Sequence, residues 1–499
     1  MAKPFYITTA IHYPNGRPHI GHAYEMIAAD AIARFQRQQG RDVFFQTGTD
    51  EHGLKMVQTA RGRGMTAREL ADEMSGYFSD MADKLDISCD RFIRTSEPEH
   101  YKASQAIWQA MTDAGDLYLD RYEGWYSVRD EAFYEEKELS EGEGGQKLSP
   151  QGTPVEWTTE ETWFFRLSKY QQPLLDFYAA NPDFIRPESR RNEILRFVEG
   201  GLSDLSVSRT SFDWGVPVPG SPGHVMYVWV DALTNYLTGA GYPDDRERMA
   251  TWWPADLHLI GKDIVRFHAV YWPAFLMSAK IALPAQVFGH GFLLNRGEKM
   301  SKSVGNVVDP MALADYYGVD ALRYFLLRDV SFGQDGTFSD EAIVTRANAD
   351  LSNSFGNLAQ RTLAFIAKNC DGQVPEGRPE EADAVLLAEV ATACAAFRTA
   401  FDDLALSQGI EAWMTGVFAC NQYIDAQAPW ALRKTDPDRM RAVLRTLIRA
   451  IRPLTETIVP VIPGSAAKLL AQLPSIDDEA FRVAPPTPIF PRLELKEDA

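Results

Sequence analysis

The sequence predicts an α/β protein in which a Rossmann-type parallel sheet carries an inserted subdomain and is followed by an α-helical region. The first fifty residues follow a strand–turn–helix–strand order, which is that of a mononucleotide-binding half. Strand-like runs resume after a segment of different character over residues 115–222. From about residue 345 the pattern is helical and rich in Ala and Leu, and it continues to Leu473.

The elements of the first half follow from local patterns. Phe5–Ile11 is typical of a buried strand, and a turn rich in Pro and Gly follows over Pro14–Pro18. The next segment is predicted to be a helix that ends at Gly40, and Val43–Phe45 is predicted to be the second strand. The apolar residues that recur at helical spacing are Tyr24, Ile27, Ala31 and Phe35.

The middle of the chain is predicted to interrupt and then resume the sheet. Asp130–Glu143 holds seven acidic residues and one Lys, which indicates a partly loop-like insertion. Tyr227–Asp231 and Leu257–Gly261 are strand-like, and the proline-rich Pro485–Pro491 is expected to run over the surface. The sheet domain is predicted in two halves, residues 1–114 and 223–292, with the insertion between them at 115–222. A further region follows over 293–350, and the helical domain over 351–499.

Composition excludes several classes of protein. The 499 residues are 45% apolar and 24% charged, which is ordinary for a globular chain and excludes collagen-like, disordered and coiled-coil proteins. The net charge of −19 repels nucleic acid as a whole, so any nucleic-acid site must be a local basic patch.

The cysteine spacing, the N-terminus and the lack of a long apolar run predict a cytoplasmic location. The four cysteines form no Cys-x-x-Cys pair, so neither a disulfide framework nor a zinc knuckle is indicated. The N-terminus has no signal-peptide pattern, and no uncharged apolar run of about 18 residues is present. We therefore expect a cytoplasmic protein that has no membrane partner.

The sequence His19-Ile20-Gly21-His22 lies between a predicted strand and a predicted helix. A helix N-terminus attracts phosphate, and Gly21 would let a nucleotide approach the backbone closely. Two imidazoles one turn apart can donate hydrogen bonds to phosphate oxygens as negative charge builds up in a transition state. On these four residues alone, a pair of helix-capping histidines explains the pattern equally well.

A second motif, Lys299-Met300-Ser301-Lys302-Ser303, follows a stretch with loop composition. Two lysines and two hydroxyls on a loop can surround a triphosphate and neutralise its leaving group. Alone, such a lysine pair is usually a solvated loop, but its pairing with the histidine motif some 280 residues earlier favours phosphate chemistry. The predicted catalytic residues are His19, His22, Lys299 and Lys302.

Together the two motifs resemble the signature of class I aminoacyl-tRNA synthetases, and the detail is similar to the bacterial methionyl-tRNA synthetase family. The resemblance is to short members that lack zinc-knuckle cysteines and a C-terminal dimerisation module. With the helical matches given below it spans residues 6–430. The other matching stretches are Tyr6–Gly16, Gly48–Gly53, Tyr227–Leu233, Ile260–Ile264, Phe267, His268 and His290–Phe292.

The resemblance implies a methionine-binding pocket. Aromatic edges attract a thioether sulfur by about 0.3–1.5 kcal/mol, and His268 and the Tyr13 hydroxyl could supply polar contacts near it. Without the resemblance, Trp229 and Tyr271 would be ascribed to the core. The implied pocket residues are Ile11, Tyr13, Trp229, Ala232, Leu233, Tyr236, Ile264, His268 and Tyr271.

The resemblance also gives Asp50 the role of holding the substrate ammonium group. This residue follows a predicted strand, where ligands of open α/β sheets bind; otherwise it would be an ordinary surface carboxylate. The cluster Asp50-Glu51-His52 could suggest a metal site. Three adjacent residues in an extended strand cannot all face one ion, so metal binding there is disfavoured.

The nucleotide site implied by the resemblance binds ATP with Mg²⁺. Asp263 is a candidate acceptor for a ribose hydroxyl, although a surface ion pair with Lys262 would also explain it. Phe292 and Leu293 could offer backbone groups to the adenine edge. The implied ATP-binding residues are His19, Gly21, His22, Gly261, Asp263, Phe292, Leu293, Lys299, Ser301 and Lys302.

The insertion departs from relatives that carry a zinc knuckle. Where those relatives have Tyr-Cys-x-x-Cys, this chain has Tyr126–Asp130, and the second half, near Ser149, also lacks cysteine. Structural zinc takes four thiolate or imidazole ligands, which Ser127, Asp130 and Ser149 cannot provide. We expect no structural zinc.

The helical region carries two features that suggest tRNA binding. Arg433–Arg452 has seven basic and two acidic residues, a local charge of +5, which fits a phosphate backbone although a solvated helix face would look the same. The resemblance places the anticodon reader nearby, with Asn357 and Arg361 reading base edges and Trp430 stacking. In isolation, Trp430 would more often be a core residue. The basic residues predicted to contact the tRNA backbone are Arg441, Arg445 and Arg449, with Arg452 on the same face.

The reaction that the resemblance implies has two steps. Methionine and ATP form methionyl-adenylate and pyrophosphate, and methionine is then transferred to the 3′ end of initiator and elongator tRNA(Met). A synthetase for Leu, Ile or Val would carry a larger editing insertion, and a cysteinyl enzyme would need thiolate ligands. A small nucleotidyltransferase would lack the helical region, and a non-catalytic tRNA-binding protein would tolerate damaged motifs. A monomer is expected, and His12 has no assigned role.

Overall fold

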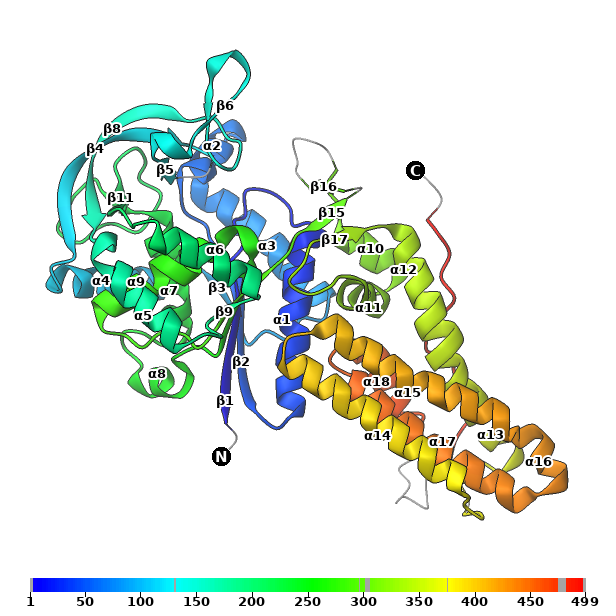
Figure 1. The fold of residues 1–499 in the computed structure, drawn as a ribbon. Helices are drawn as coiled ribbons and strands as arrows, with labels where there is room; N and C mark the ends of the chain where they lie inside the picture. Colours follow the sequence, from blue (N-terminus) through cyan, green and yellow to red (C-terminus); the bar gives the residue numbers. More distant parts are fainter. Residues whose placement is uncertain are drawn as a thin grey trace. The chain divides into compact units, whose positions relative to one another are not determined.

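The computed structural model describes residues 3–129, 132–295, 297–300, 306–374, 376–473 and 482–496. The chain divides into two compact units. The first contains Met1–Ala29, Gly40–Asp83 and Ile87–His290, and the second contains Asp30–Gln39, Lys84–Asp86 and Gly291–Ala499. Figure 1 shows the sheet-containing part in blue to green and the helical part in yellow to red.

The first unit is built on a six-stranded sheet with the order β3-β2-β1-β13-β14-β9. Every neighbouring pair in it is parallel, which confirms the predicted Rossmann-type sheet. The two longest strands, β1 and β2, are buried at every position after the first, as expected for strands covered on both faces. The strands are β1 Pro4–Thr9, β2 Asp42–Thr49, β3 Arg91–Arg94, β9 Ile185–Arg186, β13 Leu257–Gly261 and β14 Val287–His290.

The order of the strands creates a switch point beside β1. The chain leaves β1, passes through α1 (Ile20–Gln38) and enters β2 on one side, while β13 pairs with β1 on the other. Ligands of open α/β sheets bind outside the carboxyl ends of the strands at such a point. The predicted strand over Phe5–Ile11 ends two residues early at Thr9, but His12 still forms an isolated parallel bridge with Thr49.

One predicted strand is wrong. Tyr227–Asp231 begins helix α7 (Val228–Gly239), with Tyr227 as its N-cap. Its valines and aromatic residues favour a strand, but Val230–Gly239 is buried at every position. A helix that is buried on every side need not show the apolar–polar periodicity of a surface helix, so the sequence pattern could not distinguish it from a buried strand.

The remaining helices of the first unit lie around the sheet (Figure 1). They are α2 Leu54–Gly62, α3 Ala67–Lys84, α4 Pro98–Asp113, α5 Gln171–Ala180, α6 Glu188–Glu199, α8 Arg246–Trp252 and α9 Trp272–Ala279. A short 3-10 helix, η4 (Lys262–Ile264), and a π-helix, η5 (Phe267–Tyr271), follow β13.

The insertion contains a second, antiparallel sheet with the order β10-β8-β4-β5. The long strands β4 (Leu117–Ser127) and β8 (Glu156–Phe165) pair along their length, with Trp125 opposite Trp157. Phe165 belongs to the same apolar cluster as Tyr6 of β1, so the insertion shares the core of the first unit. The short strands are β5 Ala132–Tyr134, β6 Ser140–Glu141, β7 Lys147–Leu148, β10 Leu205–Ser206, β11 Ser208–Arg209 and β12 Val225–Met226.

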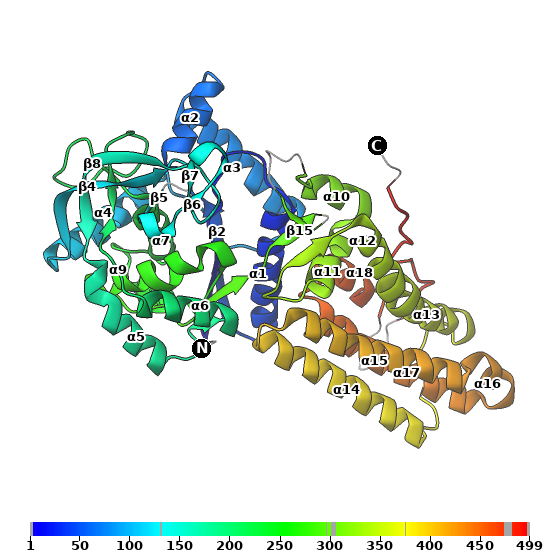
Figure 2. The same cartoon turned by 45° about the horizontal axis from the view of Figure 1, so that its top comes forward.

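The second unit is mainly helical, as predicted for the region beyond residue 345. Three of its helices, α14, α15 and α17, lie side by side in both views (Figures 1 and 2). Its strands are β15 Leu293–Asn295, β16 Glu298–Lys299 and β17 Gly336–Phe338. Its helices are α10 Pro310–Tyr317, α11 Val319–Asp329, α12 Asp340–Arg346, the π-helix η6 Ala347–Gly356, α13 Asn357–Asn369, α14 Glu381–Asp402, α15 Leu406–Gln427, α16 Pro429–Thr435, α17 Pro437–Ile458 and α18 Pro463–Leu470.

A fully buried arginine, Arg323 on α11, joins distant stretches of the second unit. Its guanidinium lies 2.6 Å from the carboxylate of Asp30, which is also fully buried. The same group donates hydrogen bonds to the backbone oxygens of Leu85 and Val461 at 3.2 and 3.1 Å. Buried charges are tolerated when they are paired and hydrogen-bonded in this way.

Among the described residues, α14 alone has the length and apolarity that a membrane span requires. It carries charges at Glu389 and Arg398 and packs against α15 and α17. One such helix is weak grounds for a membrane span, since core helices meet the same criterion. The segment Pro485–Pro491 has no regular structure, and its residues are exposed or half-buried, as predicted for a surface path.

Candidate active site

The histidine motif lies at the N-terminus of α1, which begins at Ile20. The backbone N–H of Gly21 donates to Nδ1 of His19 at 3.1 Å. The backbone N–H of His19 donates to Nδ1 of His22 at 3.0 Å. This reciprocal pattern is that of a capping box, with histidines in place of the usual hydroxyl and carboxylate. The two histidines therefore cap the start of α1, as one of the two interpretations of the motif predicted.

Capping also orients the two imidazoles. Because Nδ1 of each ring accepts a backbone hydrogen bond, the ring hydrogen is assigned to Nε2 in both His19 and His22. The rings stack with their centroids 3.8 Å apart, so both present the same edge. The capping and phosphate-binding interpretations are thus compatible, because they use different ring nitrogens.

Gly21 is required by the histidine beside it. A Cβ at this position would lie 2.9 Å from Cε1 and 3.0 Å from Nδ1 of His19. Such contacts would displace the capping ring. The structure therefore adds a local reason for glycine to the close approach of a nucleotide that the sequence suggests.

Most of the predicted methionine-binding residues come together on α7, η4 and η5. Leu233 and Tyr236 are buried in the main apolar cluster, and half-buried Trp229, Ile264 and Tyr271 pack against it. The Trp229 ring stacks on Phe267 at 3.8 Å, and Phe267 was not predicted from the sequence. Ala232 is buried in the same helix, at the helical spacing of Trp229, Leu233 and Tyr236.

His268 is locked in one orientation behind this group. Its Nδ1 lies 3.0 Å from the backbone oxygen of Ile264, and its Nε2 lies 2.7 Å from the hydroxyl of Tyr236. A carbonyl can only accept, so Nδ1 carries the hydrogen and the Tyr236 hydroxyl donates to Nε2. Burial lowers the pKa of His268 to about 4, and the hydrogen bond to Ile264 opposes this shift in part. The ring is therefore neutral at pH 7.

Two further predicted pocket residues, Ile11 and Tyr13, follow β1. Tyr13 packs against the apolar cluster of α2 and α3, together with Trp214. Ile11 is half-buried and belongs to neither cluster. Between Ile11 and Tyr13, the backbone oxygen of His12 accepts a hydrogen bond from the backbone N–H of Asp50 at 2.9 Å. The predicted polar contact from Tyr13 to the substrate sulfur therefore stays a prediction.

His12 itself is buried, and its ring stacks on Phe78 and meets His22 edge-on, with centroids 5.3 and 5.1 Å away. Burial lowers its pKa. Its Nε2 has no hydrogen-bond partner in the described part of the chain. His12 thus packs against the ring of His22 and so supports the histidine motif.

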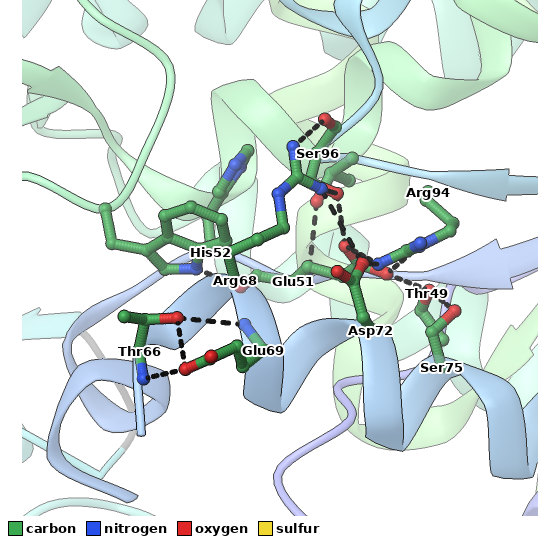
Figure 3. A network of polar contacts seen from close by, with 12 residues as sticks. Thr49, Glu51, His52, Thr66, Arg68, Glu69, Asp72, Ser75, Arg94 and Ser96 are labelled. Atoms are coloured by element: carbon green, nitrogen blue, oxygen red, sulfur yellow. Dashed lines mark hydrogen bonds and ion pairs between the residues drawn. The ribbon is translucent and has the colours of Figure 1, made fainter. Parts of the chain in front are cut away.

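Asp50 is buried directly after β2, as predicted, and its neighbours anchor it from two sides. Glu51 is fully buried and binds Arg94 through two contacts, of 2.6 and 3.0 Å. Figure 3 shows this carboxylate with Arg94 and Ser96 around it. The Trp214 indole donates to the backbone oxygen of Glu51 at 2.5 Å. The Glu51 carboxylate is therefore fully engaged by the protein.

His52 faces a different set of partners. Its Nδ1 lies 2.6 Å from Asp231 of α7, and its Nε2 lies 2.9 Å from the hydroxyl of Tyr101. The same Asp231 carboxylate lies 2.7 Å from Nε2 of His100. Glu51 and His52 thus bind separate partners, in a loop that follows the end of β2 at Thr49. No group of three or more metal-ligating side chains occurs among the residues that the structure describes.

The two imidazoles keep Asp231 ionised. Burial alone would raise its pKa, but the attraction of His52 and the hydrogen bonds from His100 and His52 prevail and hold it at about 2. An ionised carboxylate only accepts hydrogen bonds, so both facing ring nitrogens donate. Sequence reasoning missed Asp231 and His100. The position of Asp231 in the matched stretch Tyr227–Leu233, one residue before Ala232, was the available signal.

The predicted adenosine-binding residues lie in two places. Gly261 ends β13, and Asp263 is exposed on η4 just beyond it. A Cβ on Gly261 would lie 2.8 Å from the Asp263 carboxylate, which explains glycine there. In the second unit, the backbone N–H of Phe292 donates to Asp335, and its carbonyl accepts from Gly336, at 2.8 and 2.9 Å. The backbone of Phe292 is thus already engaged, whereas Leu293 lies in β15.

The lysine motif is described only in part. Lys299 ends β16, and Met300 is buried. Ser301, Lys302 and Ser303 lie outside the described residues. Their predicted roles at the triphosphate therefore stay predictions.

Three hydroxyl groups lie together where the sequence resemblance would put zinc-knuckle ligands. Ser127 and Ser149 are fully buried, and their hydroxyls lie 2.6 and 2.8 Å from that of Thr153. Asp130, the third residue predicted to be unable to hold zinc, lies outside the described residues. Three neutral hydroxyls do not fit the thiolate and imidazole ligands of structural zinc.

A pocket of about 260 Å³ lies in the helical unit. Arg361 and Trp430 both line it, with the guanidinium 5.2 Å from the ring centroid. Trp430 is 46% exposed, so it is not a core residue. Asn357 is exposed one turn before Arg361 on α13 but does not line the pocket. The remaining lining residues are Thr362, Ala364, Phe365, Lys368, Asn369, Ile424, Pro429 and Leu444.

The arginine face of α17 is less basic than its sequence suggests. Arg441 pairs with Asp438 at 2.9 Å, and Arg452 pairs with Glu456 at 3.0 Å. Arg445 donates to the backbone oxygen of Val374, and Arg449 is exposed. Asp438 is already counted in the +5 charge of Arg433–Arg452, so of these partners only Glu456 offsets a further positive charge. The predicted tRNA contacts stay predictions.

Comparisons with known proteins match both parts of the chain. The family model "tRNA synthetases class I (M)" matches residues 5–363. The model "Anticodon binding domain of methionyl tRNA ligase" matches residues 374–485. The chain belongs to the class I methionyl-tRNA synthetase family. It is therefore a ligase of the kind that forms aminoacyl-tRNA.

Individual members of the methionyl-tRNA synthetase family match over nearly the whole chain. The methionine–tRNA ligase of Brucella suis biovar 1 is 61% identical over 94% of this chain and 91% of its own length. That of Mycobacterium tuberculosis strain H37Rv is 56% identical over 99% of this chain and 98% of its own. These identities agree with the resemblance identified from the sequence.

Solved structures of the family share the fold. The Mycobacterium tuberculosis methionyl-tRNA synthetase in complex with methionyl-adenylate superposes with a TM-score of 0.94, 56% identity, and coverage of 98% of this chain and 100% of the other. The apo form from the same organism gives a TM-score of 0.89 over 99% of each chain. The predicted fold class, a Rossmann-type catalytic part followed by a helical anticodon-binding part, is confirmed.

Proposed function

We propose that this chain activates L-methionine with ATP and transfers it to initiator and elongator tRNA(Met). In the first step a methionine carboxylate oxygen attacks the α-phosphorus of ATP and expels pyrophosphate, which leaves methionyl-adenylate. In the second step the terminal ribose hydroxyl of the tRNA attacks the adenylate carbonyl and releases AMP. The solved relative that carries methionyl-adenylate supports this course.

The protein need not supply a base for the first step, because the methionine carboxylate is already a nucleophile. Alignment and charge stabilisation then account for the catalysis. We assign the stabilisation to Nε2 of His19 and His22, whose Nδ1 atoms are held by the start of α1. Lys299 and Lys302 are proposed to neutralise the departing pyrophosphate.

The residues on α7, η4 and η5 are proposed to hold the methionine side chain, with Asp50 binding its ammonium group. Trp229 offers an aromatic ring fixed by its stack on Phe267, and aromatic rings attract thioether sulfur. The neutral His268 lies behind the Tyr236 hydroxyl. A neutral His268 at this end of the proposed pocket favours methionine over amino acids with charged side chains.

Mg²⁺ is proposed to arrive with ATP on its phosphates, where it would screen their negative charge. The described residues contain no side-chain group that could hold a metal by itself, which fits an ion brought in by the substrate. Zinc independence is proposed on the chemistry of the hydroxyl cluster of Ser127, Ser149 and Thr153. We also propose a cytoplasmic monomer.

Anticodon recognition is proposed for the pocket of the helical unit. Its exposed Trp430 offers a stacking surface, and the Arg361 guanidinium lies at its edge. Unstacked bases are read by this combination of stacking and edge hydrogen bonds. Asn357 would contribute from the preceding turn of α13.

The main support for this proposal is the pair of histidines at the switch point. Their Nδ1 atoms cap α1, which leaves their Nε2 hydrogens for the α-phosphate. The experiment that tests it is amino-acid-dependent ATP–pyrophosphate exchange across all twenty amino acids, without added zinc. Exchange with methionine alone supports the proposal. Exchange with another amino acid overturns the pocket assignment. The absence of exchange with every amino acid overturns the activation step, and tRNA binding would then be measured.

A further inference from the structure

Helix α7 carries two functional faces. Trp229, Leu233 and Tyr236 recur at the helical spacing of one face, which is that of the proposed methionine pocket. Asp231 points about 100° or more away from this face and is fully buried. It accepts hydrogen bonds from His52 at 2.6 Å and from His100 at 2.7 Å. The carboxylate therefore lies behind the pocket rather than in it.

His52 connects this carboxylate to the other end of the proposed substrate site. It follows Asp50 by two residues in the loop after β2. On its far side the loop is fixed by Glu51, whose carboxylate is held by Arg94 (Figure 3). Because Glu51 fixes the loop to β3, the His52–Asp231 contact ties α7 to the loop that carries Asp50. His100, on α4, holds the second oxygen of Asp231 and prevents that carboxylate from rotating.

We propose that Asp231 is a positioning residue that sets the distance between the ammonium acceptor Asp50 and the thioether-binding face of α7. This inference rests on the proposed function in one respect, since it takes Asp50 and Trp229 to bind opposite ends of methionine. A fixed distance between the two ends selects amino acids by the length of their side chains. Asp231 thereby contributes to specificity without touching the substrate.

The geometry argues for positioning rather than for packing alone. Charge-assisted hydrogen bonds to an ionised group are shorter and stronger than neutral ones. Asp231 makes two of them, to elements as far apart in sequence as the loop after β2 and α4. The Thr238 hydroxyl, on the same face of α7, also meets the His100 ring at 3.1 Å. Two contacts about two turns apart, at Asp231 and Thr238, hold the helix against rotation as well as against translation.

The test is Asp231→Asn, which keeps the shape and removes the charge. An asparagine amide hydrogen then faces one of the two imidazole N–H groups, so that contact is lost. ATP–pyrophosphate exchange gives KM for methionine and for ATP separately. We expect KM for methionine to rise at least tenfold while KM for ATP stays within twofold. KM does not depend on the folded fraction, so a loss of stability alone would leave both values unchanged.

Side-chain length gives the second readout. S-methylcysteine is one methylene shorter than methionine, and ethionine is one longer. We expect Asp231→Asn to lower the preference for methionine over these two, measured as a ratio of kcat/KM, at least tenfold. A preference equal to that of the wild type would overturn the proposal, as would a parallel rise in both KM values.

Asp116→Asn is the matched control. Asp116 is equally buried in the same unit and also accepts several hydrogen bonds, from Tyr170 at 2.5 Å and Ser278 at 2.8 Å. We expect this variant to lose stability but to keep both KM values and the length preference. A methionine-specific effect of equal size in Asp116→Asn would overturn the inference.

A second variant protects the test if Asp231→Asn does not fold. His52→Leu breaks the same link from the loop side, and it should reproduce the rise in KM for methionine. A His52→Leu enzyme with wild-type KM values would overturn the inference. If wild-type enzyme exchanged with no amino acid, or with one other than methionine, the proposed function itself would fail, which separates the two hypotheses.

Discussion

His19 and His22 stack on each other at 3.8 Å while each binds a backbone N–H of the same helix start through Nδ1. One nitrogen of each ring is therefore structural, and the other is left for the phosphate contact proposed above. This division allows the two roles to be separated by substitution. The separation rests on the fact that Asn and Gln place their amides at different distances from the backbone.

His22→Asn places an amide oxygen near the position of Nδ1 and has nothing at Nε2. We expect the variant to keep the helix cap and thermal stability but to lose about 100-fold to 1,000-fold in methionine-dependent exchange, as for loss of one donor to a developing charge. His22→Gln places its amide near Nε2. It should lose about 0.5–2 kcal/mol of stability with the cap and retain more activity. Equal activity in the two variants would contradict the division of roles.

Lys302→Ala tests the lysine motif. Removing one cation from the leaving pyrophosphate should lower the rate of adenylate formation by about 100-fold or more. Methionine affinity, measured by equilibrium dialysis, should stay unchanged because methionine does not contact the β- and γ-phosphates. Lys102→Ala serves as the control, since Lys102 is an exposed lysine paired with Asp244. Unchanged kinetics in Lys302→Ala would remove the motif from the mechanism.

Trp430→Ala tests the pocket of the helical unit. Stacking of a base on an aromatic ring contributes about 1–3 kcal/mol, so KM for tRNA(Met) in aminoacylation should rise about tenfold to 100-fold. Methionine-dependent exchange without tRNA should not change. Trp157→Ala is the control, because Trp157 is exposed to a similar degree on β8. If both variants weaken tRNA binding alike, Trp430 has no special role.

His268 predicts a pH dependence. Burial lowers its pKa to about 4, whereas an unfolded chain binds this proton near pH 6.5. Stability is therefore complete above pH 6.5 and is lost as the pH falls toward 4. At about 1.4 kcal/mol for each pH unit between the two values, the loss approaches about 3 kcal/mol. Urea unfolding at pH 7 and pH 5 measures the total pH dependence, to which buried His12 and His258 add with the same sign because burial also lowers their pKa values. His268→Gln should therefore reduce this dependence. A variant as pH-sensitive as the wild type would disprove the assignment.

Metal removal tests the hydroxyl cluster. We expect treatment with EDTA, followed by return of Mg²⁺, to leave both exchange activity and Tm unchanged. Thr153→Val removes the hydroxyl that Ser127 and Ser149 share, and it should cost about 1–3 kcal/mol because buried hydroxyls lose their partner. Activity that only Zn²⁺ restores after EDTA would show that the insertion holds a metal after all.

Local patterns predict the elements that carry a clear local signal. The strand before the histidine motif is a short apolar run that ends at a turn, and apolar residues recur at helical spacing in the helix after it. Helix α7 was taken for a strand because Val230–Gly239 is buried throughout. The antiparallel sheet of the insertion was taken for partly loop-like structure because its acidic turns obscured the long strands β4 and β8.

The sequence predicts site residues only where they belong to a short motif. His19 and His22 lie within four consecutive residues, whereas Asp231, His52 and His100 come from three segments far apart in sequence. Their meeting depends on the order of the strands and on packing, which no local window contains. Phe267 beneath Trp229 was hidden for the same reason. A match to a motif is also not enough to place a residue. Tyr13 lies in a matched stretch, but the match did not show that it packs on α2 and α3.

The buried Arg323 has a consequence for dissecting the enzyme. Its partner Asp30 and its acceptor Leu85 come from two short stretches near the N-terminus, although both belong to the second unit. A fragment that starts at Gly291 would leave a guanidinium inside an apolar interior with no counter-charge, and removing one partner of such a pair costs about 3–5 kcal/mol. The helical unit is thus discontinuous in the gene: no single cut in the coding sequence releases it whole.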